Sequence, residues 1–212
     1  DVEKEVPAKN VIIATGARVR PLPGVEVDGQ HIVSAKEVWD VDTLPKSVLI
    51  IGAGPIGVEF ATVYNAYGCD VTIVEYLPRI IPLEDEEMSA ELAKSFTRRG
   101  IKLMTSTGVD GADVTGDKVA VRVSPAKGGQ TVEVEDWDES AQEQTTAQGQ
   151  GGPQTLEVDR VLLAAGFIPN SEDLGLEELG VATQRGLIAV DDKLQTNVPG
   201  IYAIGDVTGK LA

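Results

Sequence analysis

Cysteine and histidine are almost missing from this sequence, which has one of each among its 212 residues, Cys69 and His31. A single cysteine cannot close an intrachain disulfide, which excludes a disulfide-stapled secreted fold and an intrachain dithiol pair. A zinc-type site would also lack its usual ligands, so we expect no metal centre. We expect Cys69 to be a small buried hydrophobic residue. His31 is expected to be a surface or capping residue without a catalytic role.

Positive charge and long apolar runs are scarce as well. The chain has 18 Lys and Arg against 34 Asp and Glu, a formal net charge of −16. A surface this acidic repels phosphate backbones, so we expect no nucleic-acid partner. No apolar run approaches the roughly 18 residues of a membrane-spanning helix, and the first ten residues lack a signal-peptide core. We therefore expect a cytoplasmic protein without a membrane partner.

The ends of the sequence carry no start or stop feature of their own. The chain begins with DVEKEV, without an initiating methionine, and it ends after GDVTGKLA. We expect it to be a fragment of a longer protein.

What the sequence does contain is a parallel α/β pattern in its first half. Residues 47–51 form a continuous β-branched and leucine run, which is typical of a strand buried on both faces of a parallel sheet. A helix is expected to begin at Pro55, where a missing N–H costs nothing, and to end near Gly68. A second strand is predicted over residues 71–75. These elements make a complete βαβ unit, the framework of a Rossmann-like dinucleotide-binding domain.

A second helix and a third strand continue this pattern. The helix is predicted over residues 85–99, because its first turn is acidic and its last turn is basic. The strand is predicted over residues 101–104. Three apolar residues at helical spacing should form the buried stripe of the helix: Met88, Leu92 and Phe96.

The apolar period changes to two in the second half of the chain. Residues 118–123 and 131–134 alternate apolar and polar side chains, as antiparallel strands do, which predicts a β-meander. Residues 160–166 return to the pattern of a buried strand. Residues 135–154 are rich in Gln, Thr, Glu and Gly and contain no Lys or Arg, so we expect a long, mobile hairpin loop. Trp137 is the one residue there that argues for packing.

The glycine-rich turn after the first strand is the main functional motif. Residues 52–57, GAGPIG, match G-x-G-x-x-G between a predicted strand and a predicted helix. Gly52 should make the tight turn, Gly54 should let a pyrophosphate approach the backbone, and Gly57 should let the helix pack on the strand. The phosphates would lie on free N–H groups at the helix start. A structural turn that binds nothing is the alternative.

Three charged residues lie near this turn, and two of them bear on which dinucleotide it binds. Glu75 ends the second strand, where a carboxylate accepts hydrogen bonds from ribose hydroxyls and repels a 2′-phosphate. This favours NAD over NADP, although Arg79 could receive a 2′-phosphate. Glu59 follows the third glycine closely, and it is either a helix-dipole acid or a partner in function.

Five short motifs in a fixed order point to a known family. They are VIIATGA (11–17), GAGPIGVE (52–59), VE (74–75), AAGFIPN (164–170) and TNVPGIYAIGD (196–206). The set resembles the flavoprotein disulfide reductases, the class I pyridine nucleotide-disulfide oxidoreductases that bind two dinucleotides. The likeness is strongest to the dihydrolipoamide dehydrogenases, whose bacterial forms are similar to VEYLPRIIPLEDEEMS at 74–89. It extends over nearly the whole chain.

The resemblance implies an NAD-binding domain inserted between the two parts of an FAD-binding domain. Residues 1–45 would be an FAD-domain remnant and linker, residues 46–166 the NAD domain, and residues 167–212 a second FAD-domain remnant. The NAD site would comprise Gly52, Ala53, Gly54, Pro55, Ile56, Gly57, Val58, Glu59 and Glu75, with Val109 lining the adenine pocket and Gly166 near the nicotinamide. In the longer protein FAD would be bound by Thr15, Gly16, Ala17, Gly205 and Asp206, with Asp206 on the ribityl chain.

The resemblance also implies an activity. Electrons would pass from dihydrolipoyl groups through a redox disulfide and FAD to NAD+, in a homodimer that serves a lipoyl-carrying 2-oxo acid dehydrogenase complex. Glu59 would pair with a lysine beside that disulfide. The family's first FAD loop, its C-x-x-x-x-C pair and its catalytic histidine have no match in this sequence. The chain alone is therefore expected to bind NAD(H) without holding FAD and without catalysing the reaction.

Other functions remain open alternatives. Phe167 stands where the family usually has arginine. A disulfide reductase, NADH oxidase or mercuric reductase of the same superfamily would share the NAD domain. A flavin-independent dehydrogenase and a non-catalytic nucleotide-binding module are the alternatives from other classes.

Overall fold

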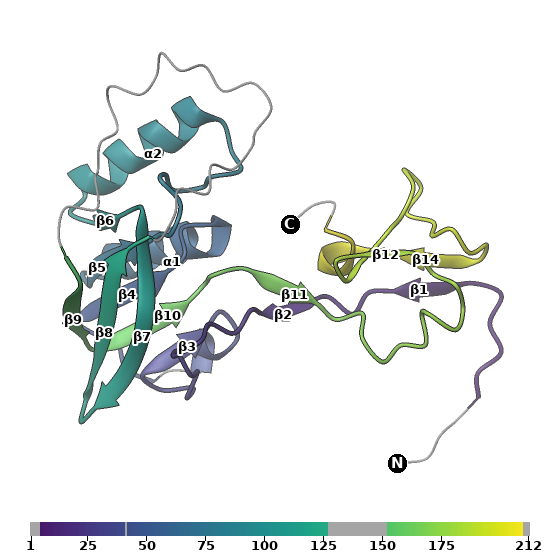
Figure 1. Cartoon of the computed structure of the whole chain (residues 1–212), viewed down its shortest axis with the longest axis horizontal. Coiled ribbons are helices and arrows are strands. Elements are labelled where there is room, and N and C mark those ends of the chain that lie inside the picture. Colours follow the sequence, from purple (N-terminus) through teal and green to yellow (C-terminus); the bar gives the residue numbers. More distant parts are fainter. Residues whose placement is uncertain (1–4, 41, 127–151, 210–212) are drawn as a thin grey trace. The chain divides into compact units, whose positions relative to one another are not determined.

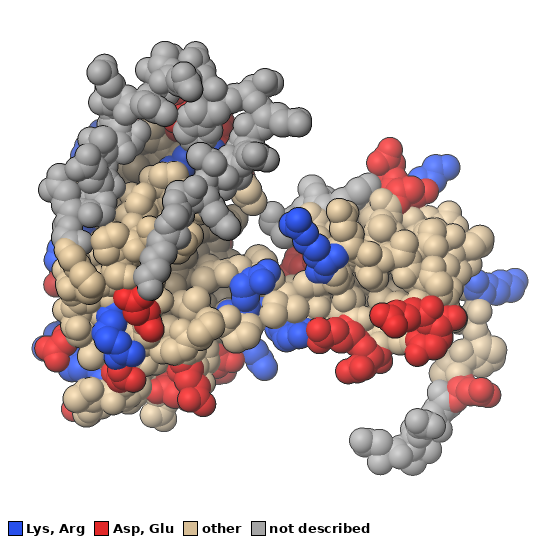
Figure 2. Space-filling view, viewed as in Figure 1, with Lys and Arg blue, Asp and Glu red and all other residues tan. Residues whose placement is uncertain are grey.

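The chain folds into two compact units. The computed structural model describes residues 5–40, 42–126 and 152–209 (Figure 1). The central unit is Pro21–Gly166, and the smaller unit combines Asp1–Arg20 with Phe167–Ala212. The strand predicted at 131–134, most of the loop predicted at 135–154 and Trp137 lie outside the described residues. Figure 2 shows acidic side chains, with basic ones among them, on the visible face of both units.

A five-stranded parallel sheet forms the centre of the larger unit, in the order β3-β10-β4-β5-β6 (Figure 1). Helix α1 connects β4 to β5, and helix α2 connects β5 to β6. This arrangement confirms the predicted α/β class. The elements are β3 (Ile32–Ser34), β4 (Ser47–Ile51), α1 (Pro55–Ala66), β5 (Asp70–Val74), α2 (Glu86–Arg98), β6 (Lys102–Met104) and β10 (Arg160–Leu163).

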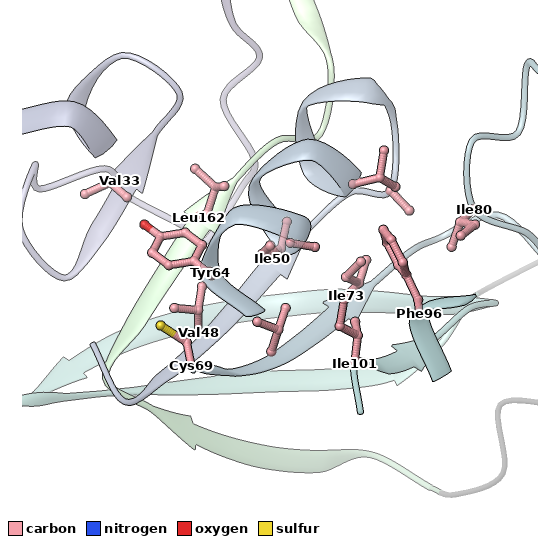
Figure 3. Close-up of a cluster of buried hydrophobic side chains, with 14 residues drawn as sticks. Val33, Val48, Ile50, Tyr64, Cys69, Ile73, Ile80, Phe96, Ile101 and Leu162 are labelled. Carbon is pink, nitrogen blue, oxygen red and sulfur yellow. The ribbon is translucent and has the colours of Figure 1, made fainter. Parts of the chain in front are cut away.

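Side chains from both helices and from the sheet make one hydrophobic core. Figure 3 shows Tyr64 of α1 and Phe96 of α2 among sheet residues such as Ile50 and Ile73. Cys69 belongs to this core with 4% of its surface exposed, as expected, and its thiol donates to the Pro45 carbonyl at 3.0 Å. Burial raises the pKa of the Cys69 thiol, which keeps it protonated and unreactive at neutral pH.

Helix α2 turns two of its three predicted stripe residues to the core. Phe96 is buried and Leu92 packs against the same core, as expected, but Met88 is 62% exposed and Ser89 takes the inward position. The Ser89 hydroxyl donates to the Ile80 carbonyl at 2.7 Å, and the Asp85 carboxylate caps the helix start by accepting from two backbone N–H groups. These polar bonds fix the rotation of the helix, so the prediction for Met88 was wrong.

An antiparallel sheet follows the parallel one. It joins β7 (Thr107–Thr115), β8 (Lys118–Pro125) and β9 (Gln154–Val158) in sequence order, and β8 confirms the antiparallel strand predicted at 118–123. Strand β7 escaped prediction because glycines and aspartates interrupt its alternation, and its register shifts between Val109 and Gly111 in a β-bulge. Strand β9 begins at Gln154, the last residue of the expected loop.

The segment 21–45, expected as part of an FAD-domain remnant and linker, packs with the central unit. There β3 pairs in parallel with β10 and buries Ile32 and Val33. The strand is short and its flanks are rich in glycine and polar residues, so no periodic pattern marks it. The compact central unit begins at Pro21, whereas the start of the NAD domain was expected at residue 46. His31 lies in the preceding turn, where its backbone N–H donates to the Asp28 carboxylate at 2.8 Å.

The smaller unit is built from short strand pairs. Strand β1 pairs in parallel with β14, β2 pairs antiparallel with β11, and β12 and β13 form a hairpin. A small core includes Ile188 of β13, Ala203 of β14 and Val207. No helix in the described ranges is long and apolar enough to cross a membrane. The elements are β1 (Val11–Ile13), β2 (Ala17–Val19), β11 (Phe167–Pro169), β12 (Thr183–Gln184), β13 (Leu187–Ile188), β14 (Ile201–Ala203) and the 3-10 helix Gly205–Thr208.

Asp159 joins three strands of the central unit at the end opposite the glycine turn. Its Oδ2 accepts from the backbone N–H groups of Lys46 and Ser47, each at 2.8 Å, and the Lys118 ammonium donates to its Oδ1. The Lys118 hydrogen bond lowers the pKa of the Asp159 carboxyl to about 2. Because β8, β10 and the start of β4 meet there, the carboxylate stabilises the join between the two sheets.

We predict that this carboxylate makes stability pH-dependent. The pKa of an unfolded aspartate is about 3.9 and the folded value is lower, so the stabilisation is complete above pH ~4 and disappears as the pH falls toward ~2. Asp159→Asn should lower the free energy of unfolding by about 1–2 kcal/mol at pH 7, allowing for the half-exposed Lys118. Urea unfolding at pH 7 and pH 3 measures both values, and the deficit should be smaller at pH 3.

The control for this prediction is Asp113→Asn on β7 of the antiparallel sheet. Asp113 forms an exposed ion pair with Arg122, and such pairs contribute less than about 1 kcal/mol. A deficit for Asp159→Asn that is equal at both pH values would contradict the prediction.

Candidate functional site

The carboxyl ends of the parallel strands carry the loops of the candidate site. Strand β4 is followed by Gly52, β5 by Glu75 and β10 by Ala164, and all three strands run in the same direction. Strand β4 lies between β5 and β10, so the sheet order reverses there. Ligands of open α/β sheets bind in the crevice outside such a switch point.

The three glycines of the turn differ in the space around them. A Cβ on Gly52 would lie 2.5 Å from the Ala164 carbonyl oxygen, and a Cβ on Gly57 would lie 2.0 Å from the Gly52 carbonyl oxygen. The φ of Gly52 is +101°, a left-handed value that favours glycine. The positive φ of Gly52 suits the tight turn predicted for it, and the close approach at Gly57 suits the packing of the helix on the strand. A Cβ on Gly54, in contrast, would meet nothing within 4 Å, so the space beside this residue is open.

The open space at Gly54 lies where helix α1 begins. Gly54 is the N-cap and Pro55 is the first helical residue. The first intrahelical bond is donated by Val58 to the Gly54 carbonyl at 3.1 Å, so the geometry of a helix leaves the N–H groups of Ile56 and Gly57 without an intrahelical acceptor. Amides at a helix start, together with the helix dipole, favour an anion.

Glu75 holds the glycine turn in place. Its side chain is 8% exposed; Oε2 accepts from the Ala53 N–H at 2.7 Å and Oε1 from the Leu77 N–H at 2.8 Å. The Ile81 N–H donates to the Ala53 carbonyl at 2.7 Å, so both polar groups of the Ala53 backbone are used. Sequence reasoning missed this clamp, because Leu77 and Ile81 carry no polar side chain that would mark them. Each carboxylate oxygen keeps a lone pair for a ribose hydroxyl.

The remaining residues expected around the turn divide into buried and exposed ones. The side chains of Ala53 and Val58 belong to the hydrophobic core, so only their backbone could face a ligand. Glu59 is exposed on α1. The Arg79 guanidinium donates to the Pro82 carbonyl at 2.8 Å, a bond that holds its own loop.

Two further expected residues lie on adjoining segments. Val109 is partly buried on β7, near the point where the Thr107 N–H donates to the Glu75 carbonyl at 2.9 Å. Gly166 is exposed, has φ +94°, and follows Ala164, which packs against Gly52. The fold thus brings the expected NAD residues to one end of the sheet.

The residues expected at an FAD site gather in the smaller unit. Thr15, Gly16 and Ala17 follow β1, and Gly205 and Asp206 follow β14. These two strands are parallel neighbours, and the Ile204 N–H donates to the Ile13 carbonyl at 3.0 Å. Gly16 and Gly205 both have positive φ and open space at the Cβ position, and Asp206 is exposed. Across residues 5–40, 42–126 and 152–209, no group of three or more His, Cys, Asp or Glu side chains could hold a metal ion.

Curated proteins of known name are similar to this chain in sequence. The dihydrolipoyl dehydrogenase of Rhizobium etli is 45% identical over 202 residues, which cover 95% of this chain and 37% of that protein. The dihydrolipoyl dehydrogenase of Mycobacterium leprae is 43% identical over 208 residues, covering 98% and 39%. The chain therefore spans about two fifths of the length of the curated relatives it matches.

Solved structures give the same result. LpdA from Mycobacterium tuberculosis superposes with a TM-score of 0.76 at 31% identity, covering 96% of this chain and 39% of that one. The HOCl-induced flavoprotein disulfide reductase RclA from Escherichia coli superposes with a TM-score of 0.72 at 27% identity, covering 95% and 40%. A family model described as pyridine nucleotide-disulphide oxidoreductase matches residues 1–212. The glycine turn, the strand-end glutamate and these similarities together show that the chain belongs to the pyridine nucleotide-disulphide oxidoreductase family.

Proposed function

We propose that the central unit binds NAD(H) and that the chain is the NAD-binding part of a dihydrolipoamide dehydrogenase. The observation that carries this proposal is the pairing of open space at Gly54 with a fixed carboxylate at Glu75, both at the carboxyl edge of one parallel sheet. The first feature suits a pyrophosphate, and the second suits a ribose.

Each part of the dinucleotide has a counterpart among the residues at this edge. The pyrophosphate would accept hydrogen bonds from the N–H groups of Ile56 and Gly57. The adenosine ribose would donate to Glu75, and the adenine would lie toward Val109. The nicotinamide would extend toward Gly166 and Glu59. The bound NAD+ supplies a hydride acceptor, and the chain positions it.

The rest of the reaction belongs to the longer protein in this proposal. Thr15, Gly16, Ala17, Gly205 and Asp206 would contribute to an FAD site, with Asp206 on the ribityl chain. Dihydrolipoyl groups of a 2-oxo acid dehydrogenase complex would be the electron donor, and the enzyme would act as a homodimer. We expect the 212-residue chain alone to bind NAD(H) without turning over dihydrolipoamide.

A second candidate function is reduction of another disulfide. The similarity to the Escherichia coli flavoprotein disulfide reductase supports it at 27% identity. The 43–45% identity to two dihydrolipoyl dehydrogenases favours the first proposal. Both candidates use the same NAD site, so the tests of that site below apply to either.

The first test fills the space beside Gly54. Gly54→Trp adds an indole where a Cβ meets nothing within 4 Å, and the Gly54 φ of −71° accepts any residue, so the fold should be kept. The side chain would take the place of the pyrophosphate. We expect the Kd for NADH to rise at least about tenfold, a loss of ~1.4 kcal/mol or more. Titration of NADH fluorescence measures the Kd, and thermal unfolding checks the fold.

Ala66→Trp is the matched control, because it adds the same exposed indole at the other end of α1. Its Kd for NADH should equal that of the unmodified chain. If Gly54→Trp binds NADH as tightly as Ala66→Trp does, the glycine turn is not the dinucleotide site.

The second test concerns the choice between NADH and NADPH. We expect the unmodified chain to bind NADH more tightly, because the Glu75 carboxylate repels a 2′-phosphate. Glu75→Gln removes the charge but keeps one side-chain oxygen to accept from Ala53 or Leu77. The ratio of the Kd for NADPH to that for NADH should fall about tenfold (~1.4 kcal/mol), as for like charges near a protein surface.

Glu91→Gln controls for the change in net charge, since Glu91 is an exposed residue on α2 that pairs with Lys94 and Arg98. Its preference for NADH should be unchanged. An unchanged preference in Glu75→Gln would show that Glu75 does not face the 2′ position.

A further inference from the structure

We propose that Ile81 is a positioning residue for the glycine turn, and that its strained backbone holds the turn in the shape that receives a pyrophosphate. This inference rests on the proposed NAD(H) site. Ile81 acts through the backbone of Ala53 rather than on the ligand. Its N–H donates to the Ala53 carbonyl at 2.7 Å, from the loop that follows β5.

The backbone of Ile81 has an uncommon conformation. Its φ is +39°, a left-handed value that is an outlier for a β-branched residue. Pro82 follows it, and a proline favours an extended conformation in the residue before it. Strained residues persist only where the surrounding structure determines them, and they cluster at functional sites. The strain at Ile81 is therefore offset by contacts that its loop makes on both sides.

A single peptide group connects helix α2 to the glycine turn. The Ile80 carbonyl and the Ile81 N–H belong to one planar peptide and point in opposite directions. The carbonyl accepts from the Ser89 hydroxyl at 2.7 Å, and the N–H donates to Ala53. The Ile80 side chain is buried, and Figure 3 shows it in the same cluster as Phe96 of α2. Anchoring at α2 thus sets the direction of the Ile81 N–H.

The same planarity carries the effect into the turn. The Ala53 carbonyl and the Gly54 N–H share one peptide plane, so a donor fixed at the Ala53 carbonyl fixes that plane. The peptide on the other side is held by Glu75, which accepts from the Ala53 N–H at 2.7 Å. Gly54 is the N-cap of α1, and the proposed pyrophosphate donors, Ile56 and Gly57, follow in its first turn.

Gly54 needs such external support more than other residues would. It has no side chain to restrict its backbone, and a Cβ there would meet nothing within 4 Å. A turn that sampled several conformations would lose that freedom when a ligand binds, which would weaken binding. A backbone donor supplies the support without a polar side chain, so residue 81 can be apolar.

The first experiment removes the donor and keeps the side chain. In the backbone ester at position 81, the α-hydroxy acid analogue of isoleucine replaces Ile81, and an oxygen atom takes the place of the N–H. ADP-ribose is the ligand, because it carries the pyrophosphate without the nicotinamide. We expect its Kd to rise roughly 3- to 10-fold, the effect of one neutral hydrogen bond. Titration calorimetry measures the Kd.

The backbone ester at position 84 is the matched control. The Glu84 N–H donates to the Ile81 carbonyl at 3.0 Å, so this ester deletes a bond of the same loop and leaves the donor to Ala53 in place. Ser89→Ala is the second control, because an ester at position 81 also weakens the Ile80 carbonyl as an acceptor. Both controls should bind ADP-ribose within about twofold of the unmodified chain. A rise in either control equal to that of the ester at position 81 would overturn the proposal.

A side-chain variant separates the N–H of Ile81 from its packing. Ile81→Asn keeps the donor, and asparagine adopts left-handed conformations more readily than isoleucine does. We expect its Kd for ADP-ribose to stay within about twofold of the unmodified chain. If Ile81→Asn weakens binding as much as the ester does, the side chain rather than the N–H supports the turn, and the proposal is wrong.

Amide resonances provide a readout that a loss of stability does not move. The amide protons of Ile56 and Gly57 should shift downfield when ADP-ribose saturates the unmodified chain, because they donate to the pyrophosphate. The shifts should be smaller in the ester at position 81, where the donors are less well aligned, and unchanged in the ester at position 84. Equal shifts in the two esters would refute the positioning role.

The outcomes distinguish this inference from the NAD(H) site itself. If the unmodified chain binds neither NADH nor ADP-ribose, the proposed function fails. If it binds both, and the ester at position 81 binds ADP-ribose within about twofold of the unmodified chain, only the role of Ile81 is overturned. A purely structural role would lower the unfolding midpoints of both esters and leave their Kd values equal.

Discussion

The acceptance of two backbone N–H groups by the Glu75 carboxylate is the interaction on which the candidate site depends. A carboxylate that is 8% exposed is costly unless its oxygens are hydrogen-bonded, and Ala53 and Leu77 provide those bonds. These two bonds connect the glycine turn to the loop after β5. A third bond, from the Ile81 N–H to the Ala53 carbonyl, connects the same two segments. The turn is thereby held in shape before any ligand arrives, which lowers the entropy lost on binding.

Crowding around the turn separates structural glycines from the one available to a ligand. Gly52 and Gly57 touch neighbouring carbonyl groups so closely that any side chain would displace the backbone, whereas Gly54 faces open space. Substitutions at Gly52 and Gly57 would therefore report on folding, whereas a substitution at Gly54 would report on binding of the proposed ligand. The contact between Gly52 and Ala164 also couples the turn to the segment that ends at Gly166, the residue expected near the nicotinamide.

The residues proposed for the NAD site lie in one unit and those proposed for the FAD site lie in the other, and each set lies at the carboxyl ends of adjacent parallel strands. In the central unit these are β4 and β5, and in the smaller unit they are β1 and β14. Strands β1 and β14 pair although they lie nearly two hundred residues apart in the sequence. The central unit is inserted between them in the chain. Family membership accounts for this order of motifs.

The sequence by itself determined the parallel α/β class, the glycine turn, the strand-end acid at Glu75 and the resemblance to the family, because each of these depends on local periodicity or on short motifs. Only the tertiary structure decided that β3 joins the sheet, that Ser89 replaces Met88 on the inner face of α2, and that Glu75 clamps Ala53. Each of these depends on partners that are distant in sequence: Glu75 is 22 residues from Ala53, and β3 pairs with a strand more than a hundred residues away. Local patterns carry no record of such partners, because the contact exists only after the chain has folded.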